Sequence, residues 1–94
     1  MKLSAVLLDL SIEGFKLELV SRGWLKPGEI YWLSIPLRPF DIAGPSQLRM
    51  RIVIRWFDPH AQRAGGLFFK PTIDSISLVQ DILENLARNS HFHD

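Results

Sequence analysis

The chain has 94 residues, 47% of them hydrophobic, and carries 11 Lys and Arg against 10 Asp and Glu. This length fits one domain with one core, and the composition excludes a disordered chain. The formal net charge of +1 argues against a dedicated binder of polymeric nucleic acid or of membrane surfaces, since both depend on clustered positive charge. The chain has no cysteine, which excludes disulfides and thiolate metal sites and agrees with a cytoplasmic location, the one we expect.

The first apolar segment begins at Leu3 and meets a carboxylate at Asp9, so it is too short for a signal peptide or a membrane span. We therefore expect no membrane insertion. Residues 3–10 are rich in Val and Leu, which indicates a buried strand. Ser11 and Gly14 follow with turn chemistry, because Ser bonds nearby amides and Gly accepts positive φ.

The next two strands are predicted from alternation and from bulky residues. Phe15, Leu17 and Leu19 alternate with polar residues, which predicts a second strand in a hairpin with the first. A loop rich in Gly and Pro precedes a third strand at 29–37. Trp24 lies in that loop, and we expect its side chain to fold back over the core, as tryptophans in loops often do. The alternative is that Trp24 serves as a stacking platform or as an anchor for a partner.

The clearest strand covers residues 47–57, and a return strand covers residues 63–70. Strict alternation places one set of residues inside: Leu48, Met50, Ile52, Ile54 and Trp56. Trp32, in the third strand, is likewise expected in the core. Arg49, Arg51 and Arg55 form a basic stripe on the other face, which we interpret as solvated and paired with Glu18 or Glu29, with an anion or partner contact as the alternative.

The last segment changes to helical spacing. Apolar residues recur three or four positions apart at Ile76, Val79, Leu83 and Leu86. This predicts an amphipathic helix over about 74–88, with Asp74 or Ser75 as N-cap and a frayed tail at 89–94. The expected fold is therefore mainly β: a small antiparallel β-barrel of about five to six strands with one C-terminal α-helix, in one domain spanning 1–94.

The chain offers little for catalysis or metal binding. Asp9, Ser11 and Glu13 share one turn, but no histidine can be assigned to them as a base. His60 lies in a turn and is expected to be exposed. The His91-x-His93-Asp94 cluster sits in a terminal tail that is no preformed metal site. We expect no enzyme activity, no metal and no cofactor.

Asp9-x-Ser11-x-x-Gly14 lies between an apolar strand and an alternating one, Gly28 precedes a strand of large apolar residues, and Gly65-Gly66-Leu67-Phe68-Phe69 precedes a C-terminal helix. In this order the chain resembles a PilZ domain, the bacterial β-barrel module that acts as a receptor for cyclic di-GMP. The likeness covers roughly residues 3–86. It implies that Asp9 accepts hydrogen bonds from guanine N–H groups, that Ser11 bonds a polar edge of the ligand, and that Gly14 lets the backbone turn closely beneath it.

The chain departs from the family at one element. PilZ domains carry an Arg-x-x-x-Arg pair ahead of the first of these strands, and no such pair precedes residues 3–10 here. Arg51 and Arg55 have the spacing but lie in a downstream strand. Because guanidinium groups clamp phosphate and stack on purines, the family ligand would need substitute cations, for which we name Arg49, Arg51 and Arg55, with Lys2, Arg22 and Arg63 as further options.

The resemblance implies a bacterial cyclic di-GMP receptor or adaptor that relays the second-messenger signal to an unidentified protein partner, as in the control of motility, pili or exopolysaccharide. The alternative is a degenerate PilZ-like interaction domain that does not bind the nucleotide. A third option, an OB-like barrel for single-stranded nucleic acid, conflicts with the near-neutral charge. A missing first strand would leave a sheet edge open near residues 3–10 or at the strand that neighbours them in space, so we also expect homo-oligomers.

Overall fold

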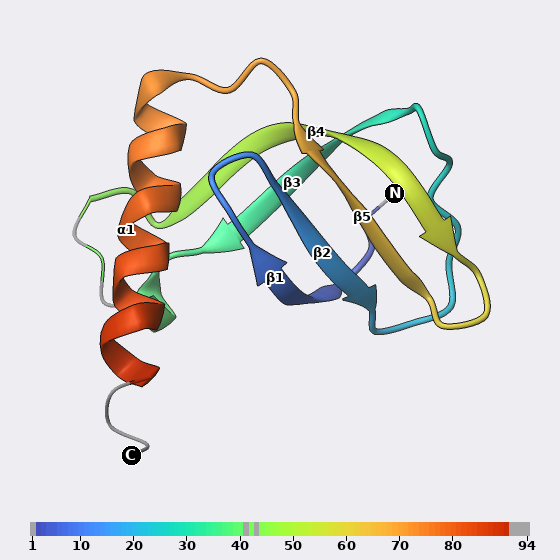
Figure 1. Cartoon of the computed structure of the whole chain (residues 1–94), viewed down its shortest axis with the longest axis horizontal. Helices are drawn as coiled ribbons and strands as arrows, with labels where there is room; N and C mark the ends of the chain where they lie inside the picture. Colours follow the sequence, from blue (N-terminus) through green and yellow to red (C-terminus); the bar gives the residue numbers. More distant parts are fainter. Residues whose placement is uncertain (1, 41, 43, 91–94) are drawn as a thin grey trace.

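The structure, a computed structural model, describes residues 2–40, 42 and 44–90. Five antiparallel strands form one curled sheet in the order β1-β2-β5-β4-β3, and one helix follows them (Figure 1). The elements are β1 (Ala5–Leu10), β2 (Gly14–Leu19), β3 (Ile30–Pro36), the short 3-10 helix η1 (Arg38–Phe40), β4 (Gln47–Asp58), β5 (Arg63–Phe68) and α1 (Ile73–Ser90). The predicted class, a small antiparallel β-barrel fold with one C-terminal helix, is confirmed, as a half-barrel with β1 and β3 at its edges.

The core lies on the concave face of the sheet, where the alternating residues of the central strands point inward. In β2 these are Phe15, Leu17 and Leu19, and in β4 they run from Leu48 to Ile54 at every second position. The Phe15 and Phe68 rings stack with their centroids 6.2 Å apart across the β2–β5 pair. The central strands therefore hold the half-barrel together through one continuous apolar layer.

The alternation of β4 breaks at a bulge between Ile54 and Trp56. The extra residue, Arg55, moves Trp56 to the outer face, where it pairs with Gly65, and Phe57 to the inner face. The prediction that Trp56 belongs to the core is therefore wrong, and its side chain is 41% exposed.

Two further tryptophans were also expected in or over the core and are not there. Trp32 points outward from β3 and is 63% exposed, because Tyr31, Leu33 and Ile35 are the residues of that strand that face inward. Trp24 is exposed as well and touches Phe57 edge-on at 5.2 Å between ring centroids. Its neighbour Leu25 fills the core position instead.

The helix α1 stands at one end of the half-barrel, beside η1 and the start of β4 (Figure 1). Val79 and Ile82 are its buried residues, whereas Leu86, which the periodicity placed on the apolar stripe, is exposed. Asn85 donates from Nδ2 to the Phe40 carbonyl at 2.7 Å, which ties the helix to η1. The helix is longer than the predicted 74–88, since Asn89 and Ser90 continue it; residues 91–94, with the His91 and His93 cluster, lie outside the described residues.

The N-cap of α1 is Thr72, not Asp74 or Ser75. The Thr72 Oγ1 accepts a hydrogen bond from the Ser75 backbone N–H at 3.1 Å, and its carbonyl accepts the Ile76 N–H at 3.0 Å. This is the N-cap arrangement, in which the side-chain oxygen satisfies the N–H three residues on. Within the described residues, no helix has both the length and the hydropathy of a membrane span.

The turn of the β4–β5 hairpin is stabilised by the buried side chain of Gln62. Gln62 has φ 57° and lies at the end of the turn that Asp58 opens by accepting the N–H groups of His60 and Ala61 at 2.9 and 3.1 Å. Its side chain donates to the Pro59 carbonyl at 2.8 Å and accepts the Gly23 N–H at 2.7 Å. The nitrogen and the oxygen of this buried side-chain amide therefore both have hydrogen-bond partners. This avoids the free-energy cost of burying an unpaired polar group. His60 is exposed in this turn.

Candidate functional site

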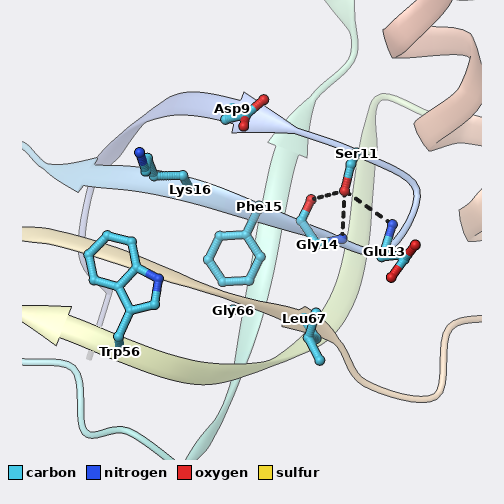
Figure 2. A pocket seen from close by; sticks show the side chains of 9 residues that line it. All are labelled: Asp9, Ser11, Glu13, Gly14, Phe15, Lys16, Trp56, Gly66 and Leu67. Atoms are coloured by element: carbon cyan, nitrogen blue, oxygen red, sulfur yellow. Dashed lines mark hydrogen bonds between the residues drawn. The ribbon is translucent and has the colours of Figure 1, made fainter.

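The turn between β1 and β2 carries the Asp-x-Ser-x-x-Gly motif and is organised around one hydroxyl. The Ser11 Oγ accepts hydrogen bonds from the backbone N–H groups of Gly14 at 3.1 Å and Glu13 at 3.3 Å (Figure 2). The Ser11 N–H in turn donates to the Gly14 carbonyl at 2.9 Å. The serine therefore builds the turn itself, the role that a short hydroxyl side chain commonly plays.

Asp9 precedes the turn, and its carboxylate is exposed. Its Oδ1 accepts the Leu10 N–H at 2.9 Å, while the remaining acceptor positions face solvent. In the β1–β2 ladder Asp9 is paired with Lys16, directly after a bulge that follows Leu7. An acidic and a basic side chain therefore stand next to each other on the outer face of the sheet.

Glycines bring the backbones of β2, β5 and β4 unusually close at this point. A methyl group on Gly14 would overlap the Gly66 carbonyl oxygen, and one on Gly66 would overlap the Val53 carbonyl oxygen. A methyl group on Gly65 would overlap ring atoms of the Trp56 indole, which therefore lies over that glycine. Gly65 thus leaves room for the Trp56 indole on the outer face, whereas Gly66, paired with the buried residues Phe15 and Ile54, faces the inner side.

The β1–β2 turn and the outer side of β4 and β5 border an open groove on the outer face of the half-barrel, with a volume of about 410 Å³ (Figure 2). One side is formed by the β1–β2 hairpin with Asp9, Ser11 and Lys16, and the other by Trp56 and Leu67. Its residues are Asp9, Ser11, Glu13, Gly14, Phe15, Lys16, Trp56, Gly66 and Leu67. The groove combines two carboxylates, those of Asp9 and Glu13, with the Lys16 ammonium group and the exposed aromatic face of Trp56.

The residues proposed from the motif meet at this groove, and the proposed substitute cations do not. Asp9, Ser11 and Gly14 all line it. Gly14, however, has no positive φ, and its close approach is to the backbone of β5. The side chains of Arg49, Arg51 and Arg55 are exposed along β4 outside the lining, and Arg63 is bound to Glu18 at 2.8 Å. The expected pairing of the arginine stripe with Glu18 or Glu29 is wrong, because Glu18 takes Arg63 and Glu29 takes Lys26.

Among the lining residues that were not predicted as site residues, Lys16 and Trp56 supply the cation and the exposed aromatic ring. Lys16 is the basic residue that lines the groove among the described residues, and the sequence pattern indicates only that it is one of the polar residues that alternate with Phe15, Leu17 and Leu19. Trp56 was placed in the core because strict alternation was continued through Arg55. The signal that could have found it is the opposing Gly65-Gly66 pair, since adjacent glycines inside a strand mark a close approach by another group.

The side chains that line the groove are suited to the recognition of a polar, planar ligand. The open indole face offers a stacking surface, Lys16 offers a cation, and Asp9 offers hydrogen-bond acceptors. Among the described residues no group of three or more His, Cys, Asp or Glu side chains has a geometry that could hold a metal ion. Comparison with known proteins adds no assignment, since no family model and no curated protein matches the chain.

Proposed function

We propose that the chain is a PilZ-type receptor or adaptor domain, which binds cyclic di-GMP in the groove beside the β1–β2 turn and relays the signal to a protein partner. The observation that carries this proposal is the meeting of Asp9, Ser11 and Gly14 with Lys16 and Trp56 around one open groove. The resemblance to PilZ domains independently assigns Asp9, Ser11 and Gly14, three of these five residues, to ligand binding.

Each component has a distinct task in this proposal. The Asp9 carboxylate accepts hydrogen bonds from a guanine edge, whose N–H groups match its free acceptor positions. The exposed indole of Trp56 stacks on a guanine face, a contact worth about 1–3 kcal/mol for a base on an aromatic ring. The Lys16 ammonium lies on the outer face where a phosphate could be neutralised.

A second function, a PilZ-like interaction domain without nucleotide binding, is favoured by two observations. Among the described residues no arginine lines the groove, so the two phosphates of cyclic di-GMP would be served by one ammonium group. In addition, the Ser11 hydroxyl already satisfies two turn amides. On this alternative the motif is kept for the turn alone.

Calorimetric titration of cyclic di-GMP into the chain at moderate salt separates the two functions. For the receptor we expect saturable binding that Asp9→Ala weakens at least about tenfold, because a hydrogen bond to a charged group contributes about 1.5–3 kcal/mol. Asp74→Ala is the matched control, since it removes an exposed carboxylate from the helix and should leave the affinity unchanged.

Tryptophan fluorescence in the same titration locates the ligand. Quenching that disappears in Trp56→Phe places the nucleotide on the groove. If the wild-type chain is folded by circular dichroism and gives no heat and no quenching, the receptor proposal fails and the interaction domain is retained.

A further inference from the structure

A second feature of the outer face lies where β4 meets β3 and the segment after β5. It consists of Trp32, Arg49, Arg51, Phe69 and Lys70, and we call it the cation–aromatic surface. The Cζ atoms of Arg49 and Arg51 lie 5.0 and 5.9 Å from the centroid of the Trp32 ring. Arg51 Cζ also lies 5.4 Å from the Phe69 centroid, and Lys70 Nζ lies 5.5 Å from it. Cations and aromatic rings therefore alternate across the surface, each within cation–π range.

The charges of the cation–aromatic surface have no acidic counterpart within the described part of the chain. The ion pairs found there join Lys26 with Glu29 and Arg63 with Glu18, so neither involves Arg49, Arg51 or Lys70. All three cations are exposed, and so is the Trp32 indole between the two arginines. Three positive charges grouped on a chain of net charge +1 are complementary to an acidic ligand.

The same surface borders an unpaired sheet edge, because β3 is the last strand in the sheet order. Leu37 donates to the Ser46 carbonyl at 3.0 Å, which continues the β3–β4 ladder beyond Ile35 paired with Leu48. In an antiparallel pair, hydrogen-bonded and non-hydrogen-bonded positions alternate. The backbone groups of Ile30, Trp32 and Ser34 therefore point away from β4, toward the open edge.

We propose that this edge binds an extended acidic segment of a protein partner, which adds to β3 as a further strand and places its carboxylates against Arg49 and Arg51. An added strand hydrogen-bonds to the free backbone groups, and its outward side chains lie beside Trp32 and Ser34. Arg49 and Arg51 already extend from β4 over Trp32, so their guanidinium groups stand at the place where those side chains arrive. Guanidinium groups bind carboxylates in a bidentate geometry.

The open edge decides between a peptide and a nucleic acid. Stacking rings and cations also suit single-stranded nucleic acid, but only a polypeptide can use the backbone donors and acceptors of β3. A second copy fits less well, because two β3 edges would bring Arg49 and Arg51 of each chain together. A β1 strand from another copy, with the sequence Ala-Val-Leu-Leu-Asp-Leu, supplies one carboxylate only. The partner of stated chemistry is therefore an acidic strand-forming segment of a different protein.

This inference goes beyond the nucleotide proposal and does not depend on it, since none of the residues of the cation–aromatic surface lines the groove. The test is therefore made without cyclic di-GMP. The probe is a fluorescein-labelled twelve-residue peptide in which Glu alternates with Thr and Val, and binding to the full chain is followed by fluorescence anisotropy. Two matched peptides serve as comparisons, one with Gln in place of every Glu and one with N-methylated amides along one edge.

We expect saturable binding of the Glu peptide that is weakened at least about tenfold in the Gln peptide, in the N-methylated peptide and in the chain carrying both Arg49→Gln and Arg51→Gln. Arg88→Gln, on α1, is the matched control for loss of an exposed arginine and should leave the affinity unchanged. Hydrogen exchange of the Ile30, Trp32 and Ser34 amides should slow when the peptide is bound, a readout that simple charge attraction would not produce.

Four results would overturn the proposal. They are no saturable binding of the Glu peptide up to about 1 mM by a folded chain, equal affinity for the Gln peptide, unchanged hydrogen exchange along β3 in the complex, and tighter binding of a twelve-nucleotide oligo(dT) than of the Glu peptide. The last result would assign the cation–aromatic surface to single-stranded nucleic acid.

Discussion

At the scale of single residues, the neighbouring glycines Gly65 and Gly66 face different kinds of atom: Gly65 faces a side chain and Gly66 a backbone carbonyl. Substitution by Ala should therefore affect the stability of the fold differently at the two positions. Gly66→Ala forces a methyl group onto the Val53 carbonyl oxygen, a backbone atom that cannot rotate away. We expect it to lower the free energy of unfolding by about 2 kcal/mol, the range for overpacking in a well-packed core. Urea denaturation followed by circular dichroism measures this.

Gly65→Ala is the companion variant, because its methyl group meets the Trp56 indole, a half-exposed side chain that can swing outward. It should cost less than about 1 kcal/mol and change the tryptophan emission spectrum. Equal losses of stability in the two variants would mean that the indole is not what lies above Gly65. In that case Trp56 would not form this side of the groove.

Ser11 offers a test of the turn that is separate from ligand binding. Ser11→Ala removes the acceptor of the Gly14 and Glu13 N–H groups and should lower the free energy of unfolding by about 1 kcal/mol. Ser21→Ala removes an exposed hydroxyl from the loop after β2 and is the control, with an expected change within about 0.5 kcal/mol. Thermal unfolding of both variants measures the difference, and a Ser11→Ala as stable as Ser21→Ala would contradict the turn role.

At the scale of secondary-structure elements, patterns within a strand or helix were good predictors and contacts between elements were not. The alternation from Leu48 to Ile54 predicted which residues of β4 are buried. It failed at Trp56, because a one-residue bulge reverses the inward and outward faces and nothing in β4 itself signals it. The sequence predicted the turn at Ser11 and Gly14, although Asp9, expected in the same turn, belongs to β1. It could not show that β5 and Trp56 face them, since that depends on strand order.

The helix start shows the same limit. Asp74 and Ser75 are as good N-cap residues as Thr72, and only the observed hydrogen bonds decide among them. Thr72→Ala should lower the free energy of unfolding by about 1 kcal/mol, whereas Thr72→Ser, which keeps the hydroxyl acceptor, should cost clearly less. Chemical denaturation of the two variants measures this. A larger effect from Asp74→Ala than from Thr72→Ala would move the cap to the originally predicted position.

At the scale of the whole molecule, a five-stranded sheet that curls without closing has two open edges with different chemistry. The β3 edge is bordered by Arg49 and Arg51, whereas β1 carries the exposed apolar side chains of Val6 and Leu8. Natural sheets protect such edges with charges, prolines or bulges. β3 ends at Pro36, whose missing N–H falls on the open side. β1 has only its bulge near Leu8 and one carboxylate, Asp9, so it is the less protected edge.

We therefore expect the chain to self-associate through β1. This agrees with the homo-oligomer expected from the sequence. Two β1 strands can pair antiparallel about a twofold axis, which buries Val6 and Leu8 of both copies in one closed interface. Sedimentation velocity at rising concentration should show a dimer. Val6→Lys should shift it toward monomer, because a lysine on an edge strand opposes pairing with a second strand. Ile73→Lys, at a helix residue that is 86% exposed, makes the same change away from both edges and should leave the dimer intact. A strictly monomeric wild-type chain at high concentration would contradict this prediction and would mean that the bulge alone protects β1. If Val6→Lys and Ile73→Lys weaken the dimer equally, the cause is the added charge and not the β1 edge.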